Sequence, residues 1–271
     1  MAAAVAAAMR GHEVTLYERD RELGGQFRMA ARIPGKAEFY ETIRYYEEML
    51  ERLAVTVTMQ TEPTVDELAS FEDVIVAVGV EPKRPSLPGE DLPHVVTYAQ
   101  ILNGQVQVGR NIVIVGAGGI GCDVATYLAE HRHASPEAAS FFRAQRLVEP
   151  ASLARNITVL ARSERYGHGI GRSTRWVVKQ ELQRLGVDVL TGASVRDIRP
   201  DTVVIDHDGQ EKVVAADQVV LCTGQESARV DWLDELAAKA RVHVVGGARE
   251  SRGINAARAI REAFAAAYRI E

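Results

Sequence analysis

The sequence contains little cysteine, and this scarcity excludes several kinds of site. Its 271 residues include two cysteines, Cys122 and Cys222, which lie far apart and form no Cys-x-x-Cys motif. The pattern therefore contains no disulfide framework, zinc knuckle or dithiol redox centre. The seven histidines show no metal-ligand spacing, and no nucleophile elbow indicates a Ser/His/Asp triad. Two reduced thiols suit the cytoplasm, which is the location we expect.

The sequence also lacks a long hydrophobic run and an excess of basic charge. The apolar stretch from Met1 to Met9 is alanine-rich, has no basic flank and is too short to span a bilayer, so it predicts no signal peptide and no membrane anchor. The net charge of -5 and the scattered Lys and Arg residues give no basic patch for nucleic acid. With 46% hydrophobic and 25% charged residues, the composition is typical of a globular chain, and the length favours two domains.

The most informative stretch runs from Asn111 to Glu130. A β-branched run leads without a gap into a Gly-x-Gly-x-x-Gly turn and then into a helix-forming segment. In a dinucleotide-binding fold Gly116 would allow the tight turn, Gly118 the approach of a pyrophosphate, and Gly121 close packing of the helix on the strand. The helix N-terminus favours phosphate as well. The alternative is a glycine-rich loop without a ligand.

The beginning of the chain predicts part of a second unit of this kind. Residues 1–10 predict a helix without an N-cap that is closed by Gly11, and residues 12–18 predict a strand that ends in Glu18. Such an acidic residue binds a ribose about twenty positions after the glycine turn, so we expect that turn to lie before Met1. Gly24, Gly25 and Gln26 follow where a loop covers the cofactor. The alternative is an ordinary N-terminal helix, with Glu18 exposed at a strand end.

A predicted strand that begins with residues 156–160 ends at Ala161-Arg162, and the arginine there bears on the choice of cofactor. A carboxylate at this place binds the 2′-hydroxyl of NAD, whereas an arginine accommodates the 2′-phosphate of NADP. Arg162 therefore favours NADP, unless it is an ordinary surface arginine. The glycine-dense loop over residues 166–174 has no strand at the fingerprint spacing, so we expect a surface of close approach there rather than another phosphate turn.

The other segments predict a mixed α/β fold in which strands alternate with helices. Prolines 82, 85, 88 and 93 predict a stiff connection between domains, and residues 131–155 form an excursion with a helix around residues 137–146. An Asp208-Gly209 turn predicts a hairpin. The remaining predicted helices cover residues 36–53, 65–70, 174–185 and 254–268, and the remaining strands residues 55–58, 73–79, 187–190, 202–205, 211–214, 218–221 and 241–247.

A series of motifs resembles one family over essentially the whole chain. The series comprises residues 10–18, Leu23-Gly24-Gly25-Gln26, Ile33-Pro34-Gly35-Lys36, Ala77-Val78-Gly79, the 116–121 turn, the 167–174 loop, Cys222-Thr223-Gly224-Gln225 and Gly246-Gly247. It is similar to the C-terminal part of bacterial NADPH-dependent 2,4-dienoyl-CoA reductases, in the wider group that contains trimethylamine dehydrogenase and related enoate reductases.

The resemblance implies two Rossmann-like domains, with an NADP domain inserted into an FAD domain. We expect the FAD domain over residues 1–108 and 241–271, without its first strand and glycine loop, and the NADP domain over residues 109–240. Glu18, Gly24, Gly25, Gln26 and Gly79 would contact FAD. The NADPH pyrophosphate would lie on the glycine turn, its 2′-phosphate on Arg162, and Gly224 and Gly247 would also line the cofactor sites. Many two-dinucleotide flavoproteins have an aspartate in place of Gly247, and the dienoyl-CoA reductase branch tolerates glycine.

In that family an N-terminal barrel carries FMN, an iron–sulfur cluster and the substrate site. The expected function is therefore that of a module that passes hydride and electrons from NADPH through FAD toward an ene-reductase site on a missing barrel domain or a separate barrel chain. Hydride transfer needs proximity and orientation more than acid–base groups, so we nominate no catalytic side chain. The alternative is a truncated remnant that binds NADPH but neither holds FAD nor turns over. A disulfide reductase is opposed by the missing Cys-x-x-Cys.

Overall fold

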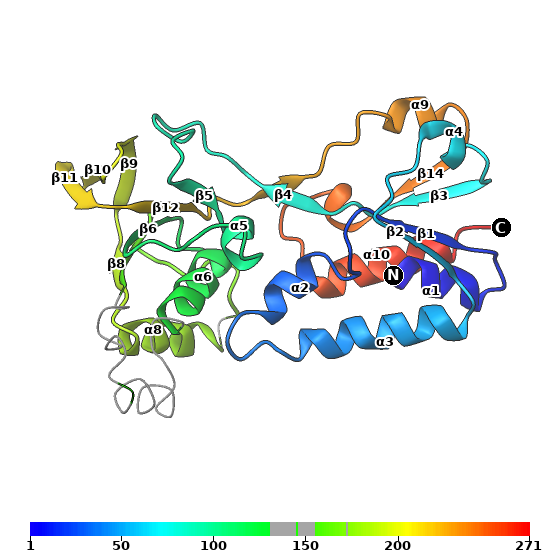
Figure 1. The fold of residues 1–271 in the computed structure, drawn as a ribbon, viewed down its shortest axis with the longest axis horizontal. Helices are drawn as coiled ribbons and strands as arrows, with labels where there is room; N and C mark the ends of the chain where they lie inside the picture. Colours follow the sequence, from blue (N-terminus) through cyan, green and yellow to red (C-terminus); the bar gives the residue numbers. More distant parts are fainter. Residues whose placement is uncertain (131–144, 146–154, 172) are drawn as a thin grey trace. The chain divides into compact units, whose positions relative to one another are not determined.

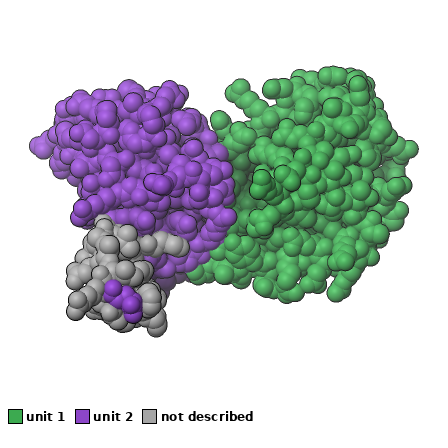
Figure 2. All heavy atoms as spheres, viewed as in Figure 1, with its two compact units in different colours: residues 1–31, 35–81, 225–271 green, residues 32–34, 82–224 purple. Residues whose placement is uncertain are grey.

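The computed structural model describes residues 1–130, 145, 155–171 and 173–271 of the chain. It divides into two compact units, which Figure 2 distinguishes by colour. Unit 1 comprises residues 1–31, 35–81 and 225–271, and unit 2 comprises residues 32–34 and 82–224. The helix expected around residues 137–146 lies outside the described residues, as does Arg172 of the second glycine loop.

Unit 2 is built around a five-stranded parallel sheet. Its order is β5-β12-β6-β7-β8, and β6 pairs with β12 on one side and with β7 on the other. All four residues of β12 and four of the five in β6 are buried, as expected for parallel strands covered on both faces. The five strands are β5 (Val95–Thr97), β6 (Asn111–Val115), β7 (Asn156–Leu160), β8 (Asp188–Leu190) and β12 (Gln218–Leu221).

The two faces of this sheet are covered differently. One face packs on an antiparallel meander of β9 (Ala193–Ile198), β10 (Thr202–His207) and β11 (Gln210–Ala215). The helices of the unit are α5 (Tyr98–Leu102), α6 (Gly119–Glu130) and α8 (Arg175–Arg184), and Figure 1 shows α6 and α8 together on the other side of the sheet. Asp208 and Gly209 join β10 to β11 with φ values of +55° and +74°, so the predicted hairpin turn is confirmed.

Unit 1 holds two separate pairs of parallel strands among its described residues. β1 (Thr15–Glu18) pairs with β2 (Thr56–Met59), and β3 (Asp73–Val76) pairs with β14 (Arg241–Val244). A shorter pair joins β4 (Val80–Pro82) to β13 (Gln225–Ser227). The unit also contains α1 (Ala2–Met9), α2 (Gln26–Ala31), α3 (Phe39–Arg52), α4 (Val65–Leu68), α9 (Leu233–Ala237), the 3-10 helix η2 (Gly246–Ala248) and α10 (Ala256–Ala267).

The cores of unit 1 follow the two-residue period of its strands. Ile75 of β3 packs with alanines of α1 and α10, which lie side by side in Figure 1. Val74 and Val76 point to the opposite face and pack with Leu68 of α4 and Leu236 of α9. The small side chains of α1 let α10 approach closely, because alanine adds little volume between two helices. The alanine-rich helix predicted for residues 1–10 is confirmed, without a side-chain N-cap.

We expected the proline-rich segment of residues 82–93 to connect two domains, and it begins where the chain passes from unit 1 to unit 2, between residues 81 and 82. It starts at the last residue of β4, leads to β5 and α5, and packs on the meander of unit 2. Pro88 accepts a hydrogen bond from the Ile198 amide at 3.0 Å, and a Cβ at Gly89 would lie 2.0 Å from the Ile198 carbonyl oxygen. Prolines suit this role because the segment needs few amide donors of its own.

Asp73, the first residue of β3, forms a polar cluster with a more exposed arginine and a histidine at the start of the β3–β14 pair. Its side chain is 7% exposed and accepts hydrogen bonds from Arg241 Nη2 at 2.6 Å and from His243 Nε2 at 2.8 Å. The hydrogen bond from Arg241 lowers the pKa of Asp73, burial opposes this effect, and His243 supports it. The cluster ties the two strands together in parallel register.

This cluster predicts a stability that depends on pH. A carboxylate whose pKa is lowered by folding stabilises the fold above its unfolded pKa, about 3.9, and loses that contribution as the pH falls through its lower folded pKa. We expect Asp73→Asn to lower the unfolding temperature at pH 7 by a few degrees, about 2–4 °C per kcal/mol lost in a domain of this size. The difference should shrink as the pH falls below 4 in thermal unfolding followed by circular dichroism, with the exposed Asp91→Asn as control. A difference that is constant with pH would contradict the ionic explanation.

Candidate nucleotide-binding site

The turn between β6 and α6 contains the three predicted glycines, and two of them are required by the fold itself. Gly116 has a φ of +108°, and a Cβ there would lie 2.4 Å from the Cys222 carbonyl oxygen. A Cβ at Gly121 would lie 1.9 Å from the Gly116 carbonyl oxygen. Gly116 therefore allows the sharp turn, and Gly121 allows α6 to start directly against it.

Gly118 differs from both, because the protein itself does not require glycine there. Its φ lies outside the left-handed region, and the nearest atom to an added Cβ is the His168 carbonyl oxygen at 3.6 Å, an ordinary contact. Gly118 thus leaves room for a ligand beside its backbone at the N-terminus of α6, a helix of 12 residues, while its carbonyl accepts the Cys122 amide at 3.0 Å. Amides and the positive end of the helix dipole face an anion at such a position, so this turn has the geometry of a pyrophosphate site.

The second glycine loop, which comprises residues 166–171, packs directly on this turn. The Gly167 amide donates to the Ala117 carbonyl at 2.7 Å, and the Gly119 amide donates to the His168 carbonyl at 2.9 Å. Gly118 and His168 also form an isolated parallel bridge. The expected surface of close approach is confirmed, and the phosphate turn has this loop as its neighbour.

Arg162 lies at the same carboxyl edge of the sheet, directly after the end of β7. It is exposed and forms no hydrogen bond or ion pair with another residue in the described part of the chain. Its neighbour Ser163 donates its hydroxyl hydrogen to the Arg165 carbonyl at 2.6 Å. Ser163 Oγ must then accept the 3.3 Å hydrogen bond from His168 Nε2. His168 therefore connects the segment after β7 to the glycine turn, and no motif in the sequence predicted this.

The nominated residues of unit 1 lie near the carboxyl ends of its parallel strands. Glu18 ends β1, and its carboxylate accepts the Asp20 amide at 3.1 Å. Gln26 begins α2 and donates through Nε2 to the Val80 carbonyl at 3.3 Å. Gln225 Nε2 in turn donates to Gln26 Oε1 at 3.4 Å, which adds a residue that the sequence reasoning did not select.

Glycines at the strand ends and turns of both units leave main chain uncovered. Gly25, Gly79 and Gly224 have positive φ values, and an added Cβ would meet no atom within 4 Å. Gly24, with a φ of +117°, packs on α3, since a Cβ there would lie 2.7 Å from Ile43 Cδ1. Gly247 packs on the end of β3, because its Cβ would lie 3.2 Å from the carbonyl carbon of Gly79. Close approach of a ligand to the backbone is sterically open at Gly25 and Gly79.

Neither cysteine belongs to a disulfide, and both are buried beside the glycine turn. Burial raises the pKa of the Cys222 thiol, and the nearby Cys122 and Asp123 add to this effect, which is the opposite of the lowered pKa of a reactive cysteine. In the described part of the chain no group of three His, Cys, Asp or Glu residues is placed to hold a metal ion. None of the described helices is long and apolar enough to cross a membrane.

A sequence model of the pyridine nucleotide-disulphide oxidoreductases matches residues 1–244, which include the glycine turn, Arg162 and most of unit 1. The chain belongs to this family. Its enzymes are oxidoreductases that use NAD(P)H and flavin. The α/β fold with parallel sheets, predicted from the sequence, is confirmed. The family's disulphide chemistry has no Cys-x-x-Cys to support it here.

The relatives of this chain include reductases of greater length. The chain is 33% identical over 234 residues to a metal reductase of Desulforamulus reducens, covering 82% of this chain and 35% of the relative. It is 26% identical over 272 residues to a bilirubin reductase of Mediterraneibacter gnavus, covering 98% and 38%. A solved structure of 2-naphthoyl-CoA reductase matches 100% of this chain and 38% of its own, with 24% identity and a TM-score of 0.84, and so shares the fold. The chain thus spans little more than a third of each.

Proposed function

We propose that the chain is an NADPH-binding and FAD-binding module that passes reducing equivalents from NADPH to FAD. The single observation that carries the proposal is the division of roles within the glycine turn. The fold requires glycine at positions 116 and 121, because a side chain there would collide with the protein backbone. At position 118 the protein itself does not require glycine. We assign the glycine at this position to a pyrophosphate that approaches its main chain.

Unit 2 is the proposed NADPH unit. Gly116, Gly118 and Gly121 hold the pyrophosphate, and Arg162 pairs with the 2′-phosphate through a charge-assisted contact. Gly224, in the turn that follows β12, leaves its main chain open at the same edge of the sheet. His168 and Ser163 line the edge between the turn and Arg162. The predicted NADP domain of residues 109–240 stays part of this proposal.

Unit 1 is the proposed FAD unit. Glu18 binds the adenosine ribose, and Gly24, Gly25 and Gln26 form the covering turn. Gly79 and Gly247 mark the ends of β3 and β14, where ligands of parallel α/β sheets bind. A flavin held by these residues would supply a hydride acceptor for the nicotinamide and a route for onward electron transfer. The protein's part is to hold and orient the cofactors, so no side chain of this chain is proposed as an acid or base.

The motif series further supports a place in the 2,4-dienoyl-CoA reductase branch. In that proposal the electrons pass to a barrel domain or barrel chain that holds FMN, an iron–sulfur cluster and the enoyl substrate. The relatives' greater length is compatible with such a partner. We also place the protein in the cytoplasm, because a reducing compartment keeps its two thiols reduced.

A second candidate is a nucleotide-binding remnant without turnover. It is favoured by one observation, namely that the described parallel strands of unit 1 form two separate pairs, whereas those of unit 2 form one sheet of five. A divided sheet offers less support for a tightly held flavin. This candidate binds NADPH in unit 2 and holds FAD poorly or not at all.

One experiment distinguishes the two candidates. The purified chain is incubated with FAD, freed of unbound flavin, and mixed anaerobically with NADPH while the flavin absorbance near 450 nm is followed. The module predicts retained yellow colour and bleaching on addition of NADPH. A colourless protein that still binds NADPH, measured by nucleotide fluorescence, would select the remnant. A chain that binds neither nucleotide would overturn both.

A further inference from the structure

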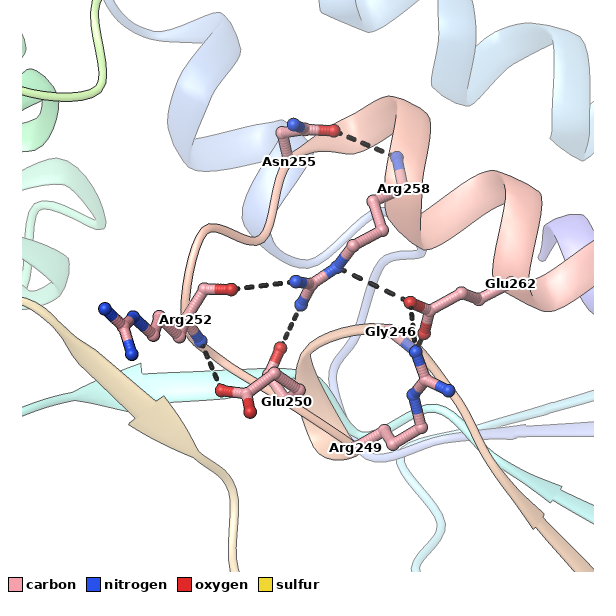
Figure 3. Close-up of polar contacts among 7 residues, drawn as sticks. All are labelled: Gly246, Arg249, Glu250, Arg252, Asn255, Arg258 and Glu262. Atoms are coloured by element: carbon pink, nitrogen blue, oxygen red, sulfur yellow. Dashed lines mark hydrogen bonds and ion pairs between the residues drawn. The ribbon is translucent and has the colours of Figure 1, made fainter.

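A cluster of charged side chains surrounds the segment that joins β14 to α10 (Figure 3). The segment includes η2 and residues 249–255, and Asn255 begins α10 by accepting the Arg258 amide at its side-chain oxygen, 2.9 Å away. The segment leads from the carboxyl end of a parallel strand to the N-terminus of a 12-residue helix. Its conformation decides where both of these ends lie.

Glu262 holds the beginning of this segment from within α10. Its Oε2 accepts the Gly246 amide at 2.7 Å, and its Oε1 accepts Arg249 Nη2 at 2.7 Å. The Glu262 side chain is only 16% exposed. A carboxylate is a stronger acceptor for an amide than a neutral group, and burial protects the contact from water.

Arg258 holds the rest of the segment from the same face of the helix. Its Nη1 donates to the Arg252 carbonyl at 2.7 Å, and its Nη2 donates to the Glu250 carbonyl. Its Nε lies 3.5 Å from Glu262 Oε1. Because residues four apart share one side of a helix, Arg258 and Glu262 act together on this segment.

Gly246, whose amide Glu262 binds, is followed by Gly247, which lies close to the backbone of Gly79. Gly246 has a φ of +61°, and Gly247 packs so tightly on the segment after β3 that an added Cβ would lie 2.6 Å from Cγ1 of Val80, the first residue of β4. Gly79 and Gly247 therefore form a joint rim at the carboxyl edge of the β3–β14 pair. A ligand at this edge meets main chain from both strands.

We propose that Glu262 is a positioning residue for the FAD site. Its carboxylate holds the Gly246 amide, and through it the Gly246–Gly247 turn, against Gly79 before any ligand arrives. The inference rests on the proposed function, because FAD is the ligand assigned to this rim. A turn held in place in advance spares the ligand the cost of ordering it, so the loss of Glu262 weakens FAD binding without the loss of a direct contact.

The test compares two variants of similar volume in the full chain. Glu262→Gln keeps an oxygen acceptor for the Gly246 amide, whereas Glu262→Met keeps the bulk and removes the acceptor. We expect the FAD dissociation constant, measured by quenching of flavin fluorescence, to rise roughly tenfold in Glu262→Met and to stay close to wild type in Glu262→Gln. Arg261→Met, on an exposed neighbour in α10, is the matched control. NADPH binding should be unchanged in every variant.

A second readout does not depend on FAD. Hydrogen exchange of the peptide that contains Gly246 and Gly247, measured without ligand, should be faster in Glu262→Met than in Glu262→Gln or wild type. If Glu262→Met does not fold, the double variant Glu262→Met/Arg249→Met removes the charge left without a partner and takes its place.

The outcomes separate this inference from the proposed function. Wild-type affinity and wild-type exchange in Glu262→Met would overturn the positioning role, and so would a Glu262→Gln variant as weak as Glu262→Met. A wild-type chain that binds NADPH but no FAD would overturn the FAD assignment of unit 1, while the exchange measurement still decides whether Glu262 holds the turn.

Discussion

Replacement of Gly118 by alanine is expected to weaken NADPH binding by roughly ten- to a hundredfold while the chain stays folded. The residue has a φ that alanine adopts freely, and the added Cβ would lie 3.6 Å from the nearest protein atom. The methyl group would instead occupy the space in which a pyrophosphate approaches the backbone. Loss of charge-assisted hydrogen bonds, each about 1.5–3 kcal/mol, accounts for that factor.

Gly121→Ala is the matched control, since the same added methyl group has a different effect three residues further on. Its Cβ would lie 1.9 Å from the Gly116 carbonyl oxygen, so the turn or the start of α6 must move. Such overpacking typically costs about 1–3 kcal/mol. We expect a lower unfolding temperature for Gly121→Ala and an unchanged one for Gly118→Ala, with NADPH titration in parallel. Full NADPH affinity in Gly118→Ala would show that no pyrophosphate lies on this turn.

The parts of the fold that the sequence predicted are those with local signals. β6, the glycine turn and α6 follow from a β-branched run, three glycines and a helix-forming segment that are consecutive in the chain. The hairpin at Asp208 and Gly209 follows from one dipeptide. These features depend on residues within a few positions of each other, so a single stretch of sequence contains the cause.

The parts that the sequence did not predict depend on distant partners. β9 mixes small, charged and apolar residues. It forms a strand because it pairs with β10 and because its last residue, Ile198, donates its amide hydrogen to the Pro88 carbonyl, more than 100 positions earlier in the chain. α5 has five residues and depends on the capping box between Thr97 and Gln100. The packing of the proline segment on the meander was not predicted, because its contacts lie on another part of the chain.

The residues of the candidate site fall into the same two groups, those with a local signal and those with distant partners. The glycines and Arg162 could be nominated from the sequence because each follows a predicted strand at a characteristic distance. His168, Gln225 and Glu262 were not, because their roles depend on contacts with Ser163, Gln26 and Gly246. Positions after a strand are readable from sequence, whereas side-chain networks between elements require the folded chain.

We propose that Arg162 determines the choice between NADPH and NADH. It lies two residues after the end of β7, it follows the buried Ala161, and its guanidinium forms no ion pair with a described residue that would have to be broken first. Ser163 and His168 stand beside it, and the hydrogen bond between them fixes His168 Nε2 as a donor to the serine. The position after β7 at which a carboxylate would bind the ribose 2′-hydroxyl of NAD is therefore occupied by a cation, Arg162.

We therefore expect Arg162→Ala to lower NADPH affinity by roughly ten- to a hundredfold and to change NADH affinity little, because only NADPH carries the 2′-phosphate. The NADPH preference of the wild-type chain should also fall with rising ionic strength, since salt screens an exposed charge pair. Arg199→Ala is the control, because that arginine is exposed and pairs with Asp197 in the meander of the same unit. Dissociation constants for both nucleotides, measured by fluorescence, give the ratio. If the ratio of the NADPH and NADH dissociation constants is unchanged in Arg162→Ala, Arg162 is an ordinary exposed arginine at a strand end. Another cation of the unit would then have to bind the 2′-phosphate.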